Sequence, residues 1–226
     1  MICVTIAAEI VRRGTEIEGA GMQEQVRFPV GDITLEGVLS APAGAPRVGV
    51  IVCHPHPLFG GDMHNNVVSA LVDAFARAGY ATLRFNFRGV GASGGVHDDG
   101  KAEVDDVKAA VTFLLSRHSV ASVAVAGYSF GSIVGLRAGA EDARVHKLIG
   151  VALPIARRDA TFLQAVTKPK LLISGDRDDI SPVPRLNELF AKLPEPKSLE
   201  IIRAADHFFA GQEDRVAWPA TAYLAP

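Results

Sequence analysis

The sequence contains little cysteine, little net charge and no long hydrophobic run, and each of these absences excludes a class of protein. Two cysteines, Cys3 and Cys53, among 226 residues cannot form a disulfide scaffold, and Cys53 lies in an apolar segment typical of a small buried side chain. A formal net charge of −2 gives no basis for a nucleic-acid groove or for attraction to an anionic membrane. No apolar stretch reaches the roughly 18 residues of a membrane-spanning helix. We therefore expect neither nucleic acid nor a membrane as a partner.

The composition favours one folded domain preceded by a short leader. Hydrophobic residues make up 48% of the chain and charged residues 21%, which is enough apolar material for a large core. We assign residues 1–22 to a leader of unknown role and 23–226 to a single domain, with Met22 as a second possible start site. In the leader, Arg12 and Arg13 follow the apolar part, the reverse of a secretory signal, so we expect a cytoplasmic location.

From residue 23 onward, strand-like and helix-like segments alternate, which predicts an α/β fold with a mostly parallel sheet and helices on both faces. The expected strands are 24–30, 33–42, 47–55, 81–89, 122–129, 147–154, 169–176 and 198–207, the first two forming an antiparallel hairpin around Gly31-Asp32. The expected helices are 63–80, 105–118, 130–140, a short one near 160–166, 182–193 and a last one from Asp214 that Pro219 interrupts. The connections are too short for a cap domain. In such sheets ligands bind at the carboxyl ends of the strands.

The segment "VAVAGYSFGSIVG" contains Gly127-Tyr128-Ser129-Phe130-Gly131, which fits G-x-S-x-G between an expected strand and an expected helix. In a nucleophile elbow the serine takes a strained backbone conformation, so the residues two before and two after it must be small. Gly127 and Gly131 meet this requirement. We therefore predict that Ser129 is a nucleophile, in preference to a serine that only caps the helix.

A serine nucleophile needs a base, and the base needs an acid that orients it. In this strand order the acid and then the histidine follow the serine along the chain. His207 directly follows the last expected strand, whereas His146 precedes a strand and belongs at the opposite edge, so His207 is the predicted base. Three carboxylates in "SGDRDDISP" compete as the acid: Asp176, Asp178 and Asp179. Asp178 is the third residue beyond the glycine that ends the strand, and turn formation or solvation explains the other two.

Four segments carry a resemblance to a known family: "HPHPLFGGDMHNNVV", "LRFNFRGVGASGG", "VAGYSFGS" and "ISGDRDD" with "ADHFF". Over residues 23 to about 215 the chain resembles the α/β-hydrolase superfamily, in particular small lidless bacterial serine hydrolases related to dienelactone-hydrolase-like proteins. The resemblance implies the α/β-hydrolase fold. It also points to Asp178, because the superfamily's acid usually ends a Gly-x-x-Asp element. Dienelactone hydrolases themselves use cysteine, so Ser129 departs from them, and Asp179 stands where proline is frequent.

An oxyanion hole needs two backbone N–H groups aimed at the oxygen that becomes negative. One is expected from Phe130, directly after the nucleophile. The other is expected from the loop after residue 53, where Pro55 and Pro57 have no N–H to give. The resemblance places this donor at His56, with Leu58 as the fallback. The expected pocket wall is apolar and consists of Leu58, Phe59, Tyr128, Phe130, Ile155, Phe208 and Phe209.

His54, His56, Asp62 and His64 also invite interpretation as a metal site, because an H-x-H pair followed by Asp and His is a zinc-hydrolase pattern. In that pattern the Asp and the next His follow closely, whereas here they come six and eight residues after His56. We therefore predict no metal and no cofactor. The segment "RGVGASGG" lacks the spacing of a dinucleotide-binding loop and the lysine of a P-loop. We expect it to be a surface turn, with Arg88 in a structural role.

Together these residues predict a cofactor-free serine hydrolase, foremost a carboxylesterase that cleaves short-chain esters of small molecules through an acyl-enzyme. A peptidase or a thioesterase with the same three residues is the first alternative. The second alternative is a catalytically idle domain used for binding. The complete set of Ser129, Asp178 and His207 argues against it. The sequence contains no signal for the oligomeric state.

Overall fold

A computed structural model describes residues 22–225. The predicted leader, apart from Met22, and Cys3 lie outside the described residues. The strands are β1 (Met22–Val30), β2 (Ile33–Ala41), β3 (Val48–Cys53), β4 (Ala81–Phe85), β5 (Ser122–Tyr128), β6 (Val145–Val151), β7 (Lys170–Gly175) and β8 (Lys197–Ile202). The helices are α1 (Asn66–Arg77), α2 (Glu103–Arg117), α3 (Phe130–Glu141), α4 (Val183–Lys192) and α5 (Glu213–Leu224), with 3₁₀ turns η1 (Pro57–Phe59) and η2 (Thr161–Ala165).

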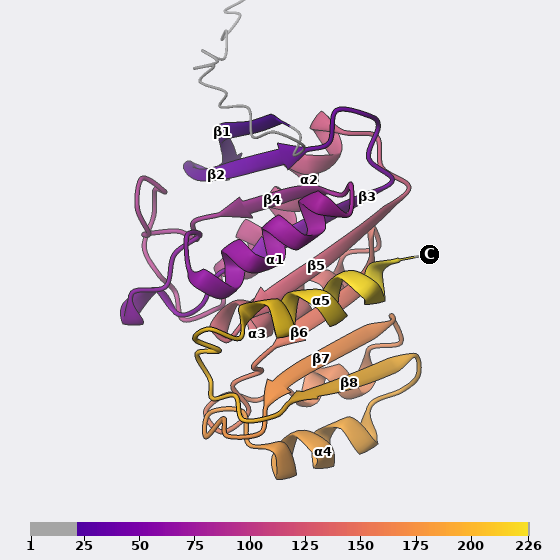
Figure 1. Cartoon of the computed structure of the whole chain (residues 1–226). Coiled ribbons are helices and arrows are strands. Elements are labelled where there is room, and N and C mark those ends of the chain that lie inside the picture. The colour runs from indigo at the N-terminus through magenta and orange to yellow at the C-terminus, as the bar shows by residue number, and fades with distance from the viewer. Residues whose placement is uncertain (1–21, 226) are drawn as a thin grey trace, which may run out of the picture.

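The strands form one eight-stranded sheet in the order β1-β2-β4-β3-β5-β6-β7-β8 (Figure 1). β1 pairs antiparallel with β2 so that Val30 lies opposite Ile33, which leaves Gly31 and Asp32 as a two-residue turn. Gly31 has φ 55° while Asp32 does not have a positive φ, as a type II′ turn with glycine at its first central position requires. β2 pairs antiparallel with β4, and the remaining neighbours pair in parallel. The predicted fold class is confirmed.

Two apolar cores lie on the two faces of the sheet. In Figure 1, α1 and α5 lie side by side over one face, and α2 and α3 lie over the other. Successive residues of a strand point to opposite faces, so Val50 and Val52 of β3 join the core under α1 and α5, while Ile51 and Cys53 join the other core. Burial on both faces explains why β3 is a continuous apolar run rather than an alternating one.

The final helix corrects one prediction, because α5 continues through Pro219 to Leu224 instead of ending there. Proline lacks the N–H that would bond to the carbonyl of Arg215, and a proline inside a helix costs about 3 kcal/mol. Burial of Ala217 and Ala220 on either side of the proline, and of Leu224 beyond it, offsets this cost. The apolar face of α5 packs against α1 and the sheet, so tertiary packing outweighs the local preference.

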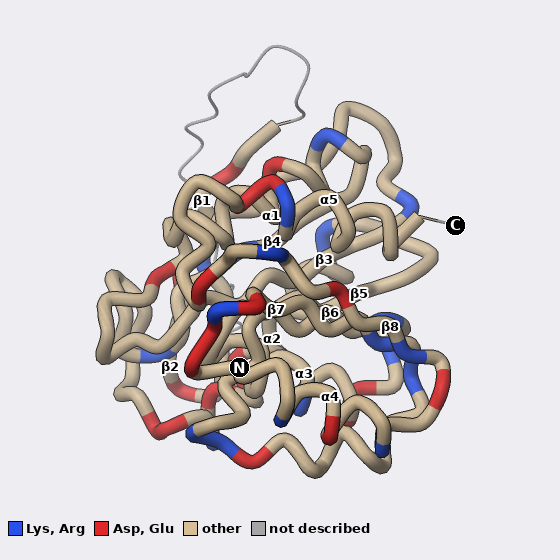
Figure 2. The backbone as a smooth tube through the Cα atoms, turned by 60° about the horizontal axis from the view of Figure 1, so that its bottom comes forward, with Lys and Arg blue, Asp and Glu red and all other residues tan. Residues whose placement is uncertain are grey.

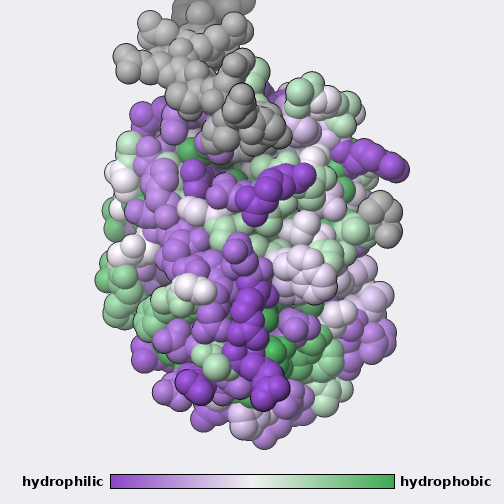
Figure 3. Space-filling model, viewed as in Figure 1, coloured by the Kyte–Doolittle hydropathy of each residue, from purple (hydrophilic) through white to green (hydrophobic). Residues whose placement is uncertain are grey.

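The carboxyl ends of the parallel strands meet at one edge of the sheet, at the left of Figure 1. Short loops follow these ends, and no segment of residues 22–225 forms a separate cap over them. None of the helices within the described range has the length and apolar character that crossing a membrane requires. Figure 3 shows hydrophilic and hydrophobic side chains interspersed over the face that carries α1 and α5.

Candidate active site

Ser129 lies in the sharp turn between β5 and α3, at the carboxyl edge of the sheet. Its backbone has φ 53° and ψ −118°, a conformation that few residues other than glycine adopt. Two hydrogen bonds hold it: the Ser129 N–H donates to the Val151 carbonyl at 2.9 Å, and the Ser132 hydroxyl donates to the Ser129 carbonyl at 2.6 Å. The turn therefore keeps its strained geometry and holds the Ser129 hydroxyl at the strand end.

The two flanking glycines are required by close backbone contacts, one within the turn and one with the loop after β3. A Cβ on Gly127 would lie 2.2 Å from the Gly131 carbonyl oxygen, and a Cβ on Gly131 would lie 2.4 Å from the His54 carbonyl oxygen. Both distances are far below van der Waals contact, and both neighbours are backbone atoms that cannot move aside. The requirement for small residues that the sequence pattern implied therefore has a steric cause in this structure.

Ser129, His207 and Asp178 form a continuous hydrogen-bonded chain. The Ser129 Oγ lies 2.9 Å from His207 Nε2, and His207 Nδ1 lies 2.8 Å from Asp178 Oδ2. The second oxygen of Asp178 accepts the backbone N–H groups of Ile180 and Ser181, each at 2.8 Å. These donors stabilise the ionised carboxylate and fix its orientation. A carboxylate at Nδ1 favours the tautomer with the proton on that nitrogen, which leaves the Nε2 lone pair facing Ser129.

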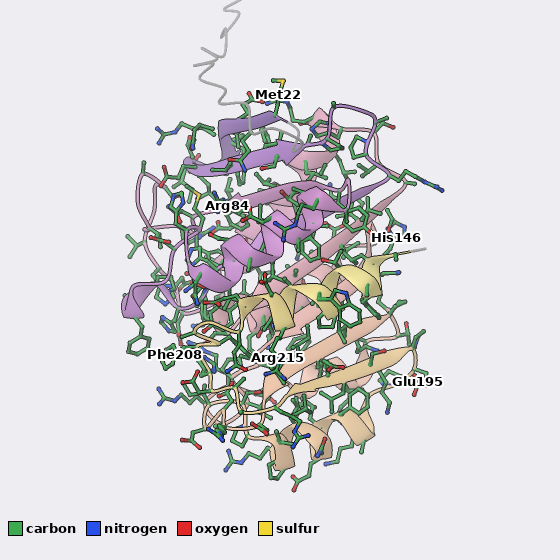
Figure 4. All side chains as sticks on the ribbon, viewed as in Figure 1. Met22, Arg84, His146, Glu195, Phe208 and Arg215 are labelled. Carbon is green, nitrogen blue, oxygen red and sulfur yellow. The ribbon has the colours of Figure 1, made fainter. Side chains whose placement is uncertain are left out.

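Of the three competing carboxylates, the structure brings only Asp178 to His207. Asp178 is buried, whereas Asp176 and Asp179 are exposed. Asp176 instead accepts the Ala204 N–H at 2.7 Å and so joins the loop after β7 to the loop after β8. His146 lies near the start of β6, and Figure 4 shows it at the opposite end of the molecule from Phe208, the residue after His207.

The loop after β3 runs beside the nucleophile turn, with the His54 carbonyl oxygen against Gly131. The rings of His56 and Phe130 have their centroids 4.8 Å apart. Phe130 is the first residue of α3, where the N–H has no intrahelical acceptor, and the His56 N–H donates to no acceptor among residues 22–225. The Leu58 N–H faces His56 Nδ1 at 3.3 Å. Both predicted donors therefore lack an acceptor within residues 22–225, whereas the fallback is turned toward the histidine ring. That Phe130 and His56 form an oxyanion hole stays a prediction.

Comparisons with known proteins agree with this architecture. A family model described as serine aminopeptidase, S33, matches residues 44–160. An alpha-beta serine hydrolase homologue from Coxiella burnetii has a solved structure that is 33% identical, with a TM-score of 0.83 over 89% of this chain and 97% of that one. The chain belongs to the α/β-hydrolase superfamily. The closer resemblance of this α/β-hydrolase to dienelactone-hydrolase-like proteins stays a prediction.

Two further relatives of this α/β-hydrolase span most of its length. Uncharacterized protein RP471 of Rickettsia prowazekii is 32% identical over 194 residues, which is 81% of this chain and 82% of the relative. The structure of XC6422 from Xanthomonas campestris, described as an α/β serine hydrolase without a lid, is 31% identical with a TM-score of 0.80, covering 89% of this chain and 93% of that one. The predicted absence of a cap domain agrees with this lidless neighbour.

A cavity of about 460 Å³ opens at Ser129 and His207 in this α/β-hydrolase. Four residues of the predicted wall line it: Phe59, Tyr128, Phe130 and Phe208. Three others do not, and the structure corrects the prediction there. Leu58 is 73% exposed on η1, Phe209 turns inward into the core under α1 and α5, and Ile155 lines a neighbouring hollow. Phe208 and Phe209 point in opposite directions, which the sequence pattern alone did not distinguish.

Tyr128 has a second role that the sequence analysis missed. Its hydroxyl donates to the His207 carbonyl at 2.8 Å and so holds the backbone of the histidine. Burial, with the nearby charges of Asp178 and Asp206, raises the pKa of Tyr128, so the phenol remains a donor. Tyr128 and His207 are 79 residues apart in the chain, and no local pattern marks such a contact.

Two of the residues that invited a zinc interpretation, His54 and Asp62, make structural contacts in this α/β-hydrolase. His54 uses both ring nitrogens, with Nδ1 2.7 Å from the Pro55 carbonyl oxygen and Nε2 accepting the Phe87 N–H at 3.0 Å. Burial lowers the pKa of His54 to about 4, so the ring is neutral. Asp62 accepts the N–H of His64 and forms a local turn. His54 and Asp62 therefore have structural roles. Arg88 also has the structural role expected for it, because it pairs with buried Asp106 at 2.6 Å.

A different group, His56, His97 and Asp99, brings potential ligand atoms within 4.8 Å of one another beside the cavity. The guanidinium of Arg158 pairs with Asp99 and lies 3.3 Å from His56 Nε2. Burial, with the neighbouring charges of His97 and Arg158, lowers the pKa of His56, and a neutral ring accepts through one nitrogen. A side-chain cation therefore already holds two of the three groups, and they fit a guanidinium better than a metal ion.

Proposed function

We propose that Ser129, His207 and Asp178 are a catalytic triad that hydrolyses carboxylic esters of small molecules through an acyl-enzyme. The observation that carries the proposal is the hydrogen-bonded chain from Ser129 Oγ to His207 Nε2 at 2.9 Å and from His207 Nδ1 to Asp178 Oδ2 at 2.8 Å. A serine hydroxyl is a weak nucleophile until a base accepts its proton, and this chain supplies a base in the required tautomer.

In the first half of the reaction, Ser129 Oγ attacks the ester carbonyl while His207 Nε2 takes its proton. Asp178 stays ionised and stabilises the imidazolium. The backbone N–H groups of Phe130 and His56 bind the oxygen that becomes negative. When the tetrahedral intermediate collapses, the bond to the alcohol breaks, and His207 gives its proton to the leaving oxygen. The acyl group remains on Ser129.

In the second half, water takes the place of the alcohol. His207 Nε2 removes a proton from the water as its oxygen attacks the acyl carbonyl. The same two N–H groups bind the second tetrahedral intermediate. Collapse breaks the bond to Ser129 Oγ, which recovers a proton from His207. One ester and one water thus give one acid and one alcohol, and no cofactor takes part.

An aminopeptidase, the activity in the matching family model's description, is a less suitable assignment for this cleft. Such an enzyme binds a protonated amino group, for which a carboxylate is the natural partner. The cavity at Ser129 has Arg157 and Arg158 in its lining and neither aspartate nor glutamate. Asp99 offsets much of the charge of Arg158, but the charge of Arg157 has no acidic partner within residues 22–225 and repels an ammonium group, so we favour esters. Thioesters share the acyl chemistry and remain the alternative.

The test compares the hydrolysis of p-nitrophenyl acetate, the uncharged thioester S-phenyl thioacetate and alanine p-nitroanilide. We expect the unmodified protein to cleave the ester fastest. Ser129→Ala and His207→Ala should each lower ester turnover by at least about 10³-fold. Ser119→Ala, which removes an exposed hydroxyl outside the site, is the matched control. Preference for the anilide would contradict the ester assignment, and more than about a tenth of the activity in either triad variant would contradict the triad.

The cytoplasmic location stays part of this proposal. It rests on the order of apolar and basic residues in the leader, where Arg12 and Arg13 follow the apolar segment.

A further inference from the structure

The cleft at Ser129 has a charge of one sign in its lining. Arg157 and Arg158, from the loop after β6, both line the cavity that contains Ser129 and His207, and no aspartate or glutamate does. The whole chain has a net charge of −2, and Figure 2 shows acidic and basic positions on many parts of the backbone. The cationic lining is therefore a local feature of this cleft and does not follow from an excess of basic residues.

Arg158 is held in a fixed position at the wall of the cleft. Its guanidinium pairs with the Asp99 carboxylate and donates to the Asp99 carbonyl at 3.2 Å. It also lies over the Phe130 ring, with 5.1 Å between the guanidinium carbon and the ring centroid. The hydrogen bond and charge of Arg158 lower the pKa of Asp99, so that carboxylate is ionised and offsets much of the charge of Arg158. Arg158 therefore packs as part of the cavity wall and contributes little net positive charge to the cleft.

Arg157 has no such partner. Its side chain is exposed and makes no hydrogen bond or ion pair with any other residue in the described part of the chain. Its backbone is nevertheless fixed, because its N–H donates to the Pro154 carbonyl at 3.0 Å. Arg88 and Arg144, by contrast, each pair with an aspartate at 2.6 Å. Arg157 thus contributes an uncompensated positive charge to the cleft from a fixed backbone position.

A neighbouring hollow of about 300 Å³ shows that this arrangement is specific to the cleft. Arg158 also borders that hollow, together with Arg185 and Lys192, but Asp159 and Glu188 line it as well. The two signs nearly balance there. The hollow also lacks the nucleophile, so a charged group bound in it would be separate from the chemistry.

We propose that the substrates of this cleft are esters that carry a carboxylate, and that Arg157 is the residue that binds it. This inference rests on the proposed esterase function. A guanidinium presents paired N–H donors whose spacing matches the two oxygens of a carboxylate, so charge and geometry both favour this partner. The aromatic wall formed by Phe59, Tyr128 and Phe208 surrounds the part of the substrate between the carboxylate and the scissile bond. Arg157 is therefore a specificity-determining residue.

The experiment measures kcat/KM for matched pairs of esters that differ in one negative charge. For a carboxylate on the acyl side, mono-p-nitrophenyl glutarate is compared with p-nitrophenyl pentanoate. For a carboxylate on the alcohol side, 4-acetoxybenzoate is compared with methyl 4-acetoxybenzoate. We expect the anionic ester to be preferred by about tenfold in one pair, which identifies the side that Arg157 reaches. The preference should fall between about 0.01 M and 1 M salt, because screening shortens the Debye length from about 30 Å to 3 Å.

Arg157→Gln should reduce the anionic-to-neutral ratio of kcat/KM in that pair by about tenfold, and Arg157→Lys should reduce it less, because lysine keeps the charge but not the paired donors. The matched control is Arg77→Gln, which removes the same charge at the exposed far end of α1 and should leave the ratio unchanged. Equal or lower turnover of the anionic ester in both pairs, or an unchanged ratio in Arg157→Gln, overturns this inference while the esterase function stands. Absence of ester turnover in the unmodified protein overturns both.

Discussion

Asp178 differs from Asp176 and Asp179 in its surroundings, not in its chemistry. Only Asp178 is buried, and only its carboxylate has two backbone donors on one oxygen and His207 Nδ1 on the other. All three aspartates lie within one segment of four residues, 176–179. The position of a single carboxylate relative to a distant histidine therefore decides which one can orient the base.

Replacement of each aspartate by asparagine separates their roles. Asp178→Asn should lower kcat by about 10³ to 10⁴-fold, since an amide at Nδ1 can stabilise the wrong tautomer of His207. Asp176→Asn and Asp179→Asn, which carry the same change on exposed side chains, should retain activity within about threefold, because exposed charges contribute little. Steady-state kinetics with p-nitrophenyl acetate measures all three. A larger loss from Asp179→Asn than from Asp178→Asn would contradict the assignment.

His54 predicts a pH dependence of stability. Burial lowers its pKa from 6.5 to about 4 in the folded protein, so between these values the unfolded chain binds a proton that the native protein does not. The contribution of neutral His54 is complete above pH 6.5 and is lost as the pH falls toward 4. The free energy of unfolding should decrease by about 3 kcal/mol over this range from this group alone.

The measurement is urea unfolding at several pH values for the unmodified protein and for His54→Gln, which cannot titrate there. The variant will be less stable at every pH, because it disturbs the bonds to Pro55 and Phe87. Its dependence on pH should nevertheless be shallower than that of the unmodified protein. Parallel curves for the two proteins would show that His54 is not held neutral by the fold.

At the scale of elements, the order of strands and helices could be predicted because alternating apolar periods and glycine-marked turns encode it locally. The ends of elements were harder to predict. The strand expected to reach residue 89 stops at Phe85, because the N–H groups of Phe87 and Arg88 donate to the side chains of His54 and Asp106 instead of to a neighbouring strand. Such acceptors come from distant parts of the chain, and their arrival cannot be predicted from the segment itself.

In the candidate site, too, the features set by adjacent residues could be predicted and those set by distant residues could not. Ser129 and its glycines were predictable because the turn's sterics appear in adjacent residues, and His207 because it follows a strand. The contacts of Tyr128 with His207 and of Arg158 with Asp99 were not predictable, since the partners are 79 and 59 residues apart in the chain. The positive charge of the cleft also depends on the fold, because it arises where the loop after β6 brings Arg157 and Arg158 to the cavity at Ser129.

Helix α5 yields a prediction at this scale. Pro219 interrupts its hydrogen bonding, yet the helix runs to Leu224 because its apolar face is buried. Pro219→Ala should restore a donor for the Arg215 carbonyl and raise the free energy of unfolding by about 1 to 3 kcal/mol. Urea unfolding measures the change. Unchanged or lower stability would mean that the helix is shaped around the proline and that its ring provides packing that alanine cannot replace.

At the scale of the whole molecule, residues 22–225 place no cap over the carboxyl ends of the strands, and this limits how much of a substrate can be removed from water. The cavity at Ser129 measures about 460 Å³, and two aromatic residues in its lining, Phe59 and Phe208, are 79% and 63% exposed. Each buried CH₂ contributes about 0.8 kcal/mol, so methylenes that extend beyond this cavity gain little.

The resulting prediction is a preference for short acyl chains. Across p-nitrophenyl esters from acetate to palmitate, kcat/KM should be highest for acyl groups of about two to six carbons, since longer chains leave the cavity. No increase in rate is expected when the substrate forms an interface. An optimum at about ten carbons or more would mean that a groove or a second subunit covers the chain and would contradict this account.

The central claim is that Ser129 is an activated nucleophile, and covalent labelling by a fluorophosphonate tests it most directly. The reagent phosphonylates a serine whose proton is taken by a neighbouring base, and peptide mass spectrometry locates the adduct. We expect one label, on Ser129, and none on the Ser129→Ala variant. The reaction should be much slower in His207→Ala, because His207 Nε2 lies 2.9 Å from the hydroxyl. An unlabelled folded protein, or a label on another residue that persists in Ser129→Ala, would contradict it.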